Sequence, residues 1–195
     1  MVWPTSPQTL RRLMLPAVAA GYAIHPFCGG DEPAFLALMN EMDFGPWDEA
    51  KLTYNLNKAI PDGWFLAVDS RDQMVATAMG LHNYKGNAPF TADLGWVACH
   101  PAHQGQGLAT ALVVRVVQRL LAAGYTRIQL HTEYYRLPAL NIYFKLGFVP
   151  LLNTAVVIPV WQDVCARLGR PYTPALWASA IRQADDCDTG QDQSR

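Results

Sequence analysis

The feature that most constrains the fold of this chain is a short turn with two glycines. It lies between an apolar run and a longer apolar segment. The run Leu94–Cys99 has the composition of a strand, and residues 108–123 carry apolar side chains at helical spacing. Gly105 and Gly107 lie between them. The first N–H groups of a helix have no partner within it and lie at the positive end of its dipole. Because glycine lets an anion approach the backbone closely, this pattern predicts a phosphate-binding turn.

The turn departs from two common nucleotide-binding motifs. A P-loop places Lys and then Ser or Thr after its second glycine, where this chain has Leu108 and Ala109. A dinucleotide-binding motif has a third glycine where Thr110 stands, and an acidic residue about 20 positions later. Residues 127–130 contain no acid. A nucleotide-dependent protein and a turn that only connects a strand to a helix remain as alternatives.

The turn resembles the acetyl-CoA signature of the GCN5-related N-acetyltransferases, the GNAT superfamily. In that family a Gln or Arg, followed by x-x-Gly-x-Gly or Ala, begins the helix that holds the pyrophosphate of coenzyme A. Gln104, Gly107 and Ala109 fill these places. Residues 137–150 are similar to the family's late helix and strand, with an Ala, a Tyr and a Gly-Phe pair at the expected spacing. The resemblance covers about residues 22–150.

This resemblance implies a set of cofactor contacts, made mostly by backbone groups. They comprise the pantetheine contacts Val97, Ala98 and Cys99, and the phosphate-turn residues Gln104, Gly105, Gln106, Gly107, Leu108, Ala109 and Thr110. Arg136 stands where many members have an Asn that contacts the cofactor. Since a guanidinium can reach a phosphate or pantetheine oxygen, we expect Arg136 to make a different contact.

Periodicity and turn residues predict alternating strands and helices. Strands are expected at 22–27, 64–68, 74–82, 127–132, 148–152 and 156–160, with another ending at Cys99. Helices are expected from Asp31 to the Gly45-Pro46 break, and over 47–60, 107–123, 138–146 and 161–168, with turns at 61–63 and 69–73. This pattern predicts an α/β (mixed α+β) sheet with helices on both faces. The resemblance implies the GNAT arrangement, in which two central strands splay apart around the cofactor.

The length of 195 residues predicts one domain. We expect an N-terminal extension over 1–21, a GNAT-like domain over 22–169, and a C-terminal extension over 170–195. The extension is polar and expected to be disordered from about residue 185. Residues 11–21 have the outline of a short secretory signal, with two arginines before an apolar run, and a packed segment is the alternative.

Charge and cysteine usage exclude several classes of function. The formal net charge is −1 without a basic stripe, so nucleic acid is not an expected partner. The apolar runs are shorter than the ~18 residues of a membrane span. The cysteines are scattered and form no Cys-x-x-Cys pair, which favours a cytoplasmic protein with reduced thiols: Cys28, Cys99, Cys165 and Cys187. His100 and His103 lack further ligands, so no metal is expected.

Direct acetyl transfer to an amine needs a proton donor for the leaving thiolate and a route for the ammonium proton. Tyr143 occupies the family's tyrosine position and is the expected acid, with packing on a buried helix face as the alternative. Asp93, Glu133 and His82 are candidate bases, and a water relay without a protein base remains open. Cys99 has no basic partner nearby, so we do not expect a thiol nucleophile.

The resemblance implies that residues 42–49 cover the amine acceptor, a small molecule or a peptide amino group. Phe44 and Trp47 are candidates for lining this region, and acidic residues there would attract a cation: Asp43, Asp48 and Glu49. Aromatic residues over 161–177 suggest either a homodimer surface or core packing. A non-catalytic acyl-CoA-binding sensor of the same fold is the alternative to an enzyme.

Overall fold

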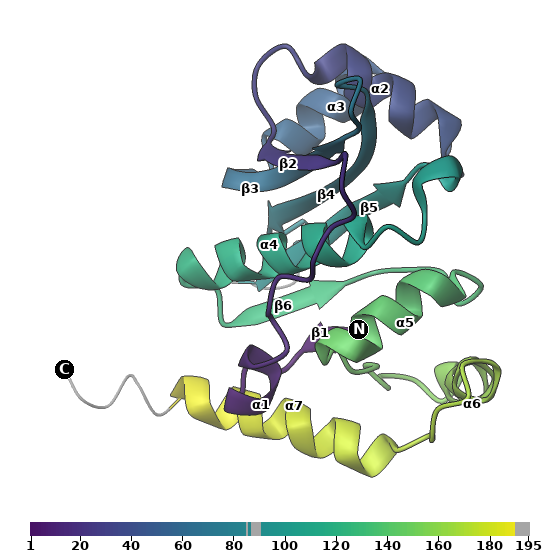
Figure 1. Cartoon of the computed structure of the whole chain (residues 1–195). Helices are drawn as coiled ribbons and strands as arrows, with labels where there is room; N and C mark the ends of the chain where they lie inside the picture. The colour runs from purple at the N-terminus through teal and green to yellow at the C-terminus, as the bar shows by residue number, and fades with distance from the viewer. Residues whose placement is uncertain (85, 87–90, 190–195) are drawn as a thin grey trace. The chain divides into compact units, whose positions relative to one another are not determined.

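The computed structural model describes residues 1–84, 86 and 91–189, apart from the side chains of residues 7 and 184–189. The chain divides into two compact units (Figure 1). Unit 1 combines Met1–Leu13 with Thr126–Arg195, and unit 2 is Met14–Tyr125.

Unit 2 contains four antiparallel strands in the order β2-β3-β4-β5. Their bounds are β2 Ala23–Pro26, β3 Ala59–Val68, β4 Met74–His82 and β5 Thr91–Cys99. The predicted hairpin turn at 69–73 joins β3 to β4. There the Asp69 carboxylate accepts hydrogen bonds from the N–H groups of Arg71 and Gln73, at 2.9 and 3.0 Å. The predicted hairpin between these two strands is confirmed.

Helices cover both faces of these strands (Figure 1). The helices are α2 Glu32–Glu41, α3 Glu49–Leu56 and α4 Leu108–Ala122. Neighbouring residues of a strand point to opposite faces. Met79 of β4 packs in a buried cluster with Phe35 and Met39 of α2. A Cβ on the next residue, Gly80, would lie 3.2 Å from side-chain atoms of α4. The small residue therefore lets α4 lie close against the opposite face.

The start of β3 differs from the prediction. A helix was expected over 47–60 and a turn over 61–63, but α3 ends at Leu56 and β3 already begins at Ala59. The pairing register with β4 shifts between Ala59 and Trp64, and Asp62 adopts a positive φ of 55°. The Pro-Asp-Gly sequence thus bends the strand without ending it, because pairing with β4 continues on both sides of the irregularity.

Unit 1 is built around a short antiparallel pair between β1 (Val2–Trp3) and β6 (Arg127–Leu130). The helices are α1 Pro7–Leu10, α5 Leu137–Leu146, α6 Val157–Arg167 and α7 Pro174–Thr189. The buried indole of Trp3 donates a 2.9 Å hydrogen bond to the carbonyl of Leu146. The first residues of the chain are therefore part of the core of unit 1.

Two strand predictions in unit 1 were wrong. Only an isolated bridge between Val149 and Val2 forms where a strand was expected over 148–152. Residues 156–160 were expected to be a strand, but α6 begins at Val157. Val164 and Cys165 in that helix are buried, so packing of one helical face overrides the local preference.

The C-terminal part of unit 1 packs through aromatic rings. Phe144 contacts Trp161 and Trp177 at centroid distances of 6.0 and 6.2 Å, and Tyr172 contacts Trp177 at 5.2 Å. These rings have packing partners within unit 1, whereas a homodimer through them stays a prediction. Helix α7 runs to Thr189, and the rest of the tail expected to be disordered, residues 190–195, lies outside the described residues.

Candidate active site

The turn between β5 and α4 has the backbone geometry that an anion-binding loop requires. Gly105 and Gly107 have φ angles of 79° and 82°, in the left-handed region that glycine enters without strain. Gly107 is the N-cap of α4, and its carbonyl accepts the N–H of Ala111 at 3.0 Å. The N–H groups of the first three helical residues, 108–110, precede that first bond and have no partner in the helix itself. The predicted phosphate turn therefore has the expected conformation.

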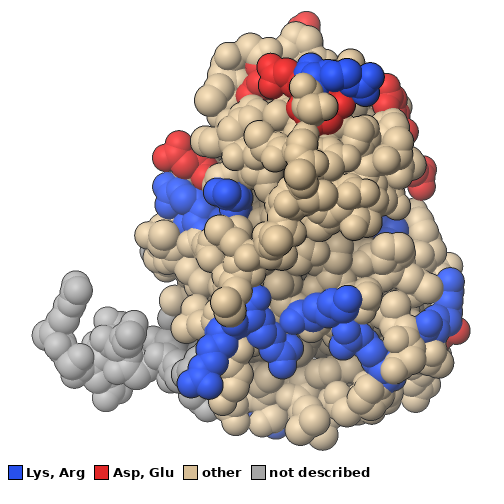
Figure 2. Space-filling view, viewed as in Figure 1, with Lys and Arg blue, Asp and Glu red and all other residues tan. Residues whose placement is uncertain are grey.

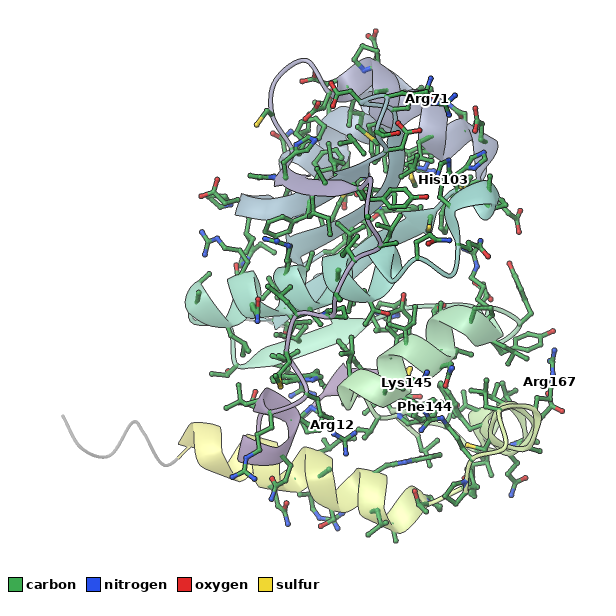
Figure 3. All side chains as sticks on the ribbon, in the orientation of Figure 1. Arg12, Arg71, His103, Phe144, Lys145 and Arg167 are labelled. Carbon is green, nitrogen blue, oxygen red and sulfur yellow. The ribbon has the colours of Figure 1, made fainter. Side chains whose placement is uncertain are left out.

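Neighbouring segments of unit 2 hold the turn in place. The Gln104 side chain donates a 3.4 Å hydrogen bond to the carbonyl of Cys99, at the end of β5. His103, labelled in Figure 3, accepts or donates a 2.9 Å hydrogen bond at Nδ1 with the Tyr22 hydroxyl. Ala19 donates its N–H to the Gln106 carbonyl at 3.3 Å. The sequence did not indicate that the segment before β2 braces this turn.

A bulge in β5 lies just before the residues assigned to pantetheine. The register with β4 passes from Met79↔Gly95 to Thr77↔Ala98, so Trp96 and Val97 lie opposite a single residue of β4. Trp96 has a φ of 48°, an uncommon conformation for a bulky residue. A bulge interrupts regular pairing and changes the direction of the backbone. Backbone groups that are not paired with a neighbouring strand can contact a ligand. Among the predicted pantetheine residues, Val97 lies in the bulge, whereas Ala98 and Cys99 are paired with β4.

Cys99 is held as a neutral thiol. Burial raises its pKa to about 11. The sulfur lies 3.8 Å from the carbonyl of His100 and 3.6 Å from that of His103, and it donates its proton toward these oxygens. A protonated thiol is a poor nucleophile. This geometry agrees with the expectation that Cys99 does not form an acyl intermediate.

The three candidate bases lie in different settings. Asp93 is buried in β5, and its carboxylate accepts the N–H of Tyr84 at 3.0 Å. His82 ends β4 and shares a 2.7 Å hydrogen bond between Nδ1 and the Tyr125 hydroxyl. Asp93 and His82 both belong to unit 2, whereas Glu133 is an exposed residue of unit 1, between β6 and α5. The base stays a prediction for each of them.

Tyr143 lies on the buried face of α5 in unit 1. Its ring contacts Phe148 at 5.8 Å between centroids, and its carbonyl accepts the Phe148 N–H at 2.9 Å. Burial raises the pKa of the phenol, and the nearby Arg136 guanidinium lowers it by a smaller amount. A phenol at its ordinary pKa is already protonated at neutral pH, and the raised pKa does not change that state. Arg136 itself is the N-cap of α5, with its guanidinium 5.7 Å from the Tyr135 ring centroid.

An aromatic cluster forms between α3 and the β5 bulge in unit 2. The Trp96 ring contacts Phe44 at 5.9 Å and Trp47 at 4.6 Å between centroids. The Trp96 indole N–H donates a 2.6 Å hydrogen bond to the buried Asn55. The sequence suggested Phe44 and Trp47 but missed Trp96 and Asn55. Positions 47, 51 and 55 are spaced by four residues, which places them on one face of a helix. This spacing could have indicated that Asn55 lies near Trp47.

The described residues contain neither a metal-binding cluster nor a membrane-spanning helix. No group of three or more His, Cys, Asp or Glu side chains in residues 1–84, 86 and 91–189 is arranged to hold a metal ion. Over the same part of the chain, no helix combines the length and the apolar character needed to cross a membrane.

A family model described as the Acetyltransferase (GNAT) family matches residues 33–148, more than half of the chain. The chain belongs to this family. The matched range includes both the phosphate turn and Tyr143. The resemblance inferred from residues 104–109 and 137–150 is therefore confirmed at the level of the family.

Curated relatives of the chain include two mycothiol acetyltransferases. That of Pseudarthrobacter chlorophenolicus is 28% identical over 141 residues, covering 68% of this chain and 44% of the relative. That of Nocardia farcinica is 28% identical over 144 residues, covering 68% of this chain and 47% of the relative. The chain spans less than half the length of these relatives.

Solved GNAT structures share the fold. The ribosomal-protein-S18-alanine N-acetyltransferase from Escherichia coli matches with a TM-score of 0.56 at 23% identity, over 67% of this chain and 79% of that one. A GNAT family N-acetyltransferase from Escherichia coli, in complex with CoA, matches with a TM-score of 0.52 at 25% identity, over 69% and 71%. These similarities confirm the predicted fold class, a mixed sheet with helices of the GNAT type.

Proposed function

We propose that this chain is an acetyltransferase that moves the acetyl group of acetyl-CoA directly to an amine. The observation that carries the proposal is the turn at 104–110, with two left-handed glycines opening α4 directly after the bulged end of β5. Membership of the GNAT family favours coenzyme A over ATP or a dinucleotide as the phosphate ligand. The CoA complex of a similar N-acetyltransferase supports the same assignment.

Backbone groups do most of the cofactor binding in this proposal. The N–H groups over 104–110 receive the pyrophosphate, where the dipole of α4 favours negative charge. Backbone groups of Val97, Ala98 and Cys99 contact pantetheine, and an N–H there polarises the thioester carbonyl as negative charge develops on its oxygen. Arg136 adds a cationic contact in place of the Asn found in many members.

Proton transfer completes the proposed reaction. The acceptor nitrogen attacks the thioester carbonyl carbon as the free amine, the C–S bond breaks, and the thiolate takes up a proton. We assign that proton to Tyr143, whose phenol is protonated at neutral pH. Asp93, Glu133 and His82 remain candidates for accepting the ammonium proton, and a water relay does not require any of them.

The acceptor is inferred to be cationic. Four acidic residues lie at the end of α2 and the start of α3: Glu41, Asp43, Asp48 and Glu49. Figure 2 shows acidic and basic side chains together on the visible face of unit 2. Opposite charge raises the local concentration of a protonated amine. We further infer a cytoplasmic enzyme, because acetyl-CoA is a cytosolic metabolite, and retain a homodimer as a prediction.

A thiol-release assay tests the proposed activity. The full chain is incubated with acetyl-CoA and a panel of small amines and peptides with free amino termini, and free CoA is measured against time. At least one amine is expected to accelerate release, and Tyr143→Phe is expected to slow it while CoA still raises the melting temperature. If CoA binds but no amine is acetylated, the acyl-CoA-binding sensor replaces the enzyme.

A further inference from the structure

The ammonium of Lys51 is held against the aromatic cluster of unit 2. Lys51 lies in the first turn of α3, and its Nζ donates to the carbonyls of Phe44 and Pro46 at 3.4 and 3.2 Å. The same nitrogen lies 4.5 Å from the centroid of the Trp47 ring and 4.9 Å from that of Trp96. A lysine on an exposed helix normally has a mobile head group in water. Here the amine has a defined position.

The indole N–H of Trp47 is a hydrogen-bond donor without an acceptor in the same cluster. Its side chain is 4% exposed, and Nε1 is buried with no partner among the described residues. The ring is fixed by edge contacts to Phe35 at 5.0 Å and to Trp96 at 4.6 Å between centroids. A buried N–H without an acceptor is costly and calls for explanation. The Trp47 N–H could therefore donate a hydrogen bond to one further carbonyl oxygen in this cluster.

Trp96 connects this amine to the segment proposed to hold pantetheine. Its indole is anchored on Asn55 at 2.6 Å, and Asn55 in turn donates to the carbonyl of Lys51 at 2.7 Å. The residue after Trp96 is Val97, the first of the three proposed pantetheine contacts. The Lys51 amine thus lies against the side chain of the residue that immediately precedes the proposed thioester site.

We propose that Lys51 is an acetyl acceptor within this chain, so that the enzyme acetylates its own α3. This inference rests on the proposed function. The unprotonated Nζ attacks the thioester carbonyl carbon of acetyl-CoA, and the C–S bond breaks. The nitrogen gives up one of its two remaining protons, the CoA thiolate takes up a proton and leaves as the thiol, and the product is an ε-amide.

The chemistry of the cluster fits both sides of this reaction. Desolvation by burial lowers the pKa of Lys51, and the Asp48 carboxylate opposes that shift. The two carbonyls and the two indole faces hold the ammonium in place, so it must lose a proton before Nζ attacks. After transfer, the new amide carbonyl supplies an acceptor of the kind that Trp47 Nε1 lacks. Acetylation also removes the charge that interacts with both indole faces, which frees the loop over 44–47 from that contact.

Site-resolved labelling tests the proposal. The full chain is incubated with acetyl-CoA carrying an isotopically labelled acetyl group, digested, and analysed by mass spectrometry. Four lysines are present, Lys51, Lys58, Lys85 and Lys145. Proximity predicts that Lys51 gains label about tenfold faster than Lys58, two turns further along the same region. The rate per molecule is expected to be independent of protein concentration, and excess free CoA is expected to suppress it.

Two comparisons separate this proposal from general lysine reactivity. Acetyl phosphate, which needs no cofactor site, is expected to label Lys51 and Lys58 at similar rates. Trp47→Phe keeps an aromatic ring but removes the indole N–H, and it is expected to slow labelling of Lys51 while the CoA-induced rise in melting temperature persists. Equal labelling of Lys51 and Lys58 in a chain that acetyl-CoA stabilises overturns the Lys51 proposal and leaves the proposed function intact. A chain that acetyl-CoA does not stabilise overturns both.

Discussion

Alanine substitutions at three glycines flanking α4 distinguish the effects of backbone strain, close packing and cofactor binding. Two of the glycines lie in the turn before the helix, and the third follows its end. Gly105, Gly107 and Gly124 all have φ between 79° and 87°. A Cβ at Gly105 or Gly124 would meet nothing within 4 Å, whereas a Cβ at Gly107 would lie 3.1 Å from the carbonyl oxygen of Ala17. The three sites therefore share the same strain and differ in one contact.

The magnitudes follow from these geometries. The left-handed conformation costs a residue with a Cβ about 1–2 kcal/mol, and the smaller entropy of the unfolded alanine chain offsets about 0.5 kcal/mol of that. Gly105→Ala and Gly124→Ala should each lower the free energy of unfolding by about 1 kcal/mol, or about 2–4 °C in Tm. Gly107→Ala should lose about 2 kcal/mol or more, because the Ala17 backbone must also move.

Thermal unfolding and calorimetric titration with CoA measure the two effects on the same samples. CoA affinity should fall for Gly105→Ala and Gly107→Ala and stay unchanged for Gly124→Ala, which lies at the other end of α4. Equal stability of the Gly105 and Gly107 variants would contradict the close packing of Ala17 on the turn. Unchanged CoA affinity in both would refute the assignment of the turn to phosphate binding.

Three other predictions concern single side chains. Tyr143→Phe should reduce kcat by about 10²-fold with little change in CoA affinity, and an unchanged kcat would remove Tyr143 from the reaction. Thr77→Val removes the acceptor of the 2.9 Å hydrogen bond from the buried Trp64 indole, and should lower the free energy of unfolding in urea by about 1–3 kcal/mol; Thr77→Ser keeps the hydroxyl and should lose clearly less. Because burial raises the pKa of Cys99 to about 11, iodoacetamide at pH 8 should alkylate the exposed Cys28 well before Cys99, and the Cys99 rate should climb steadily toward pH 11. Comparable rates at pH 8 would show that the pKa of the Cys99 thiol is not raised.

Local sequence was sufficient to predict those features whose structure is decided by neighbouring residues in the chain. The Gly105 and Gly107 turn was predictable because few residues other than glycine adopt its backbone angles. The Asp48 cap of α3 was predictable for a similar reason, and its carboxylate accepts the Lys51 N–H at 2.8 Å. The family could be recognised because two such motifs recur at fixed spacing.

Local sequence failed where distant packing decides the structure. Residues 156–160 have strand-like side chains, yet α6 forms there and buries Val164 and Cys165. The bulge at Trp96 depends on pairing with β4, which no feature of β5 alone specifies. The cluster of Lys51 with Trp96 joins residues 45 positions apart in the sequence, so helical spacing indicated only one side of it.

The most direct test of the central claim is the melting temperature of the chain with acetyl-CoA, free CoA, ATP or NAD, each in excess. A ligand that binds only the folded state at about 100 times its Kd stabilises it by about 2.7 kcal/mol, which corresponds to a rise of several degrees for a chain of this size. We expect such a rise with both CoA species and none with NAD. A well-folded sample that responds to neither CoA species would show that residues 104–110 form only a connecting turn.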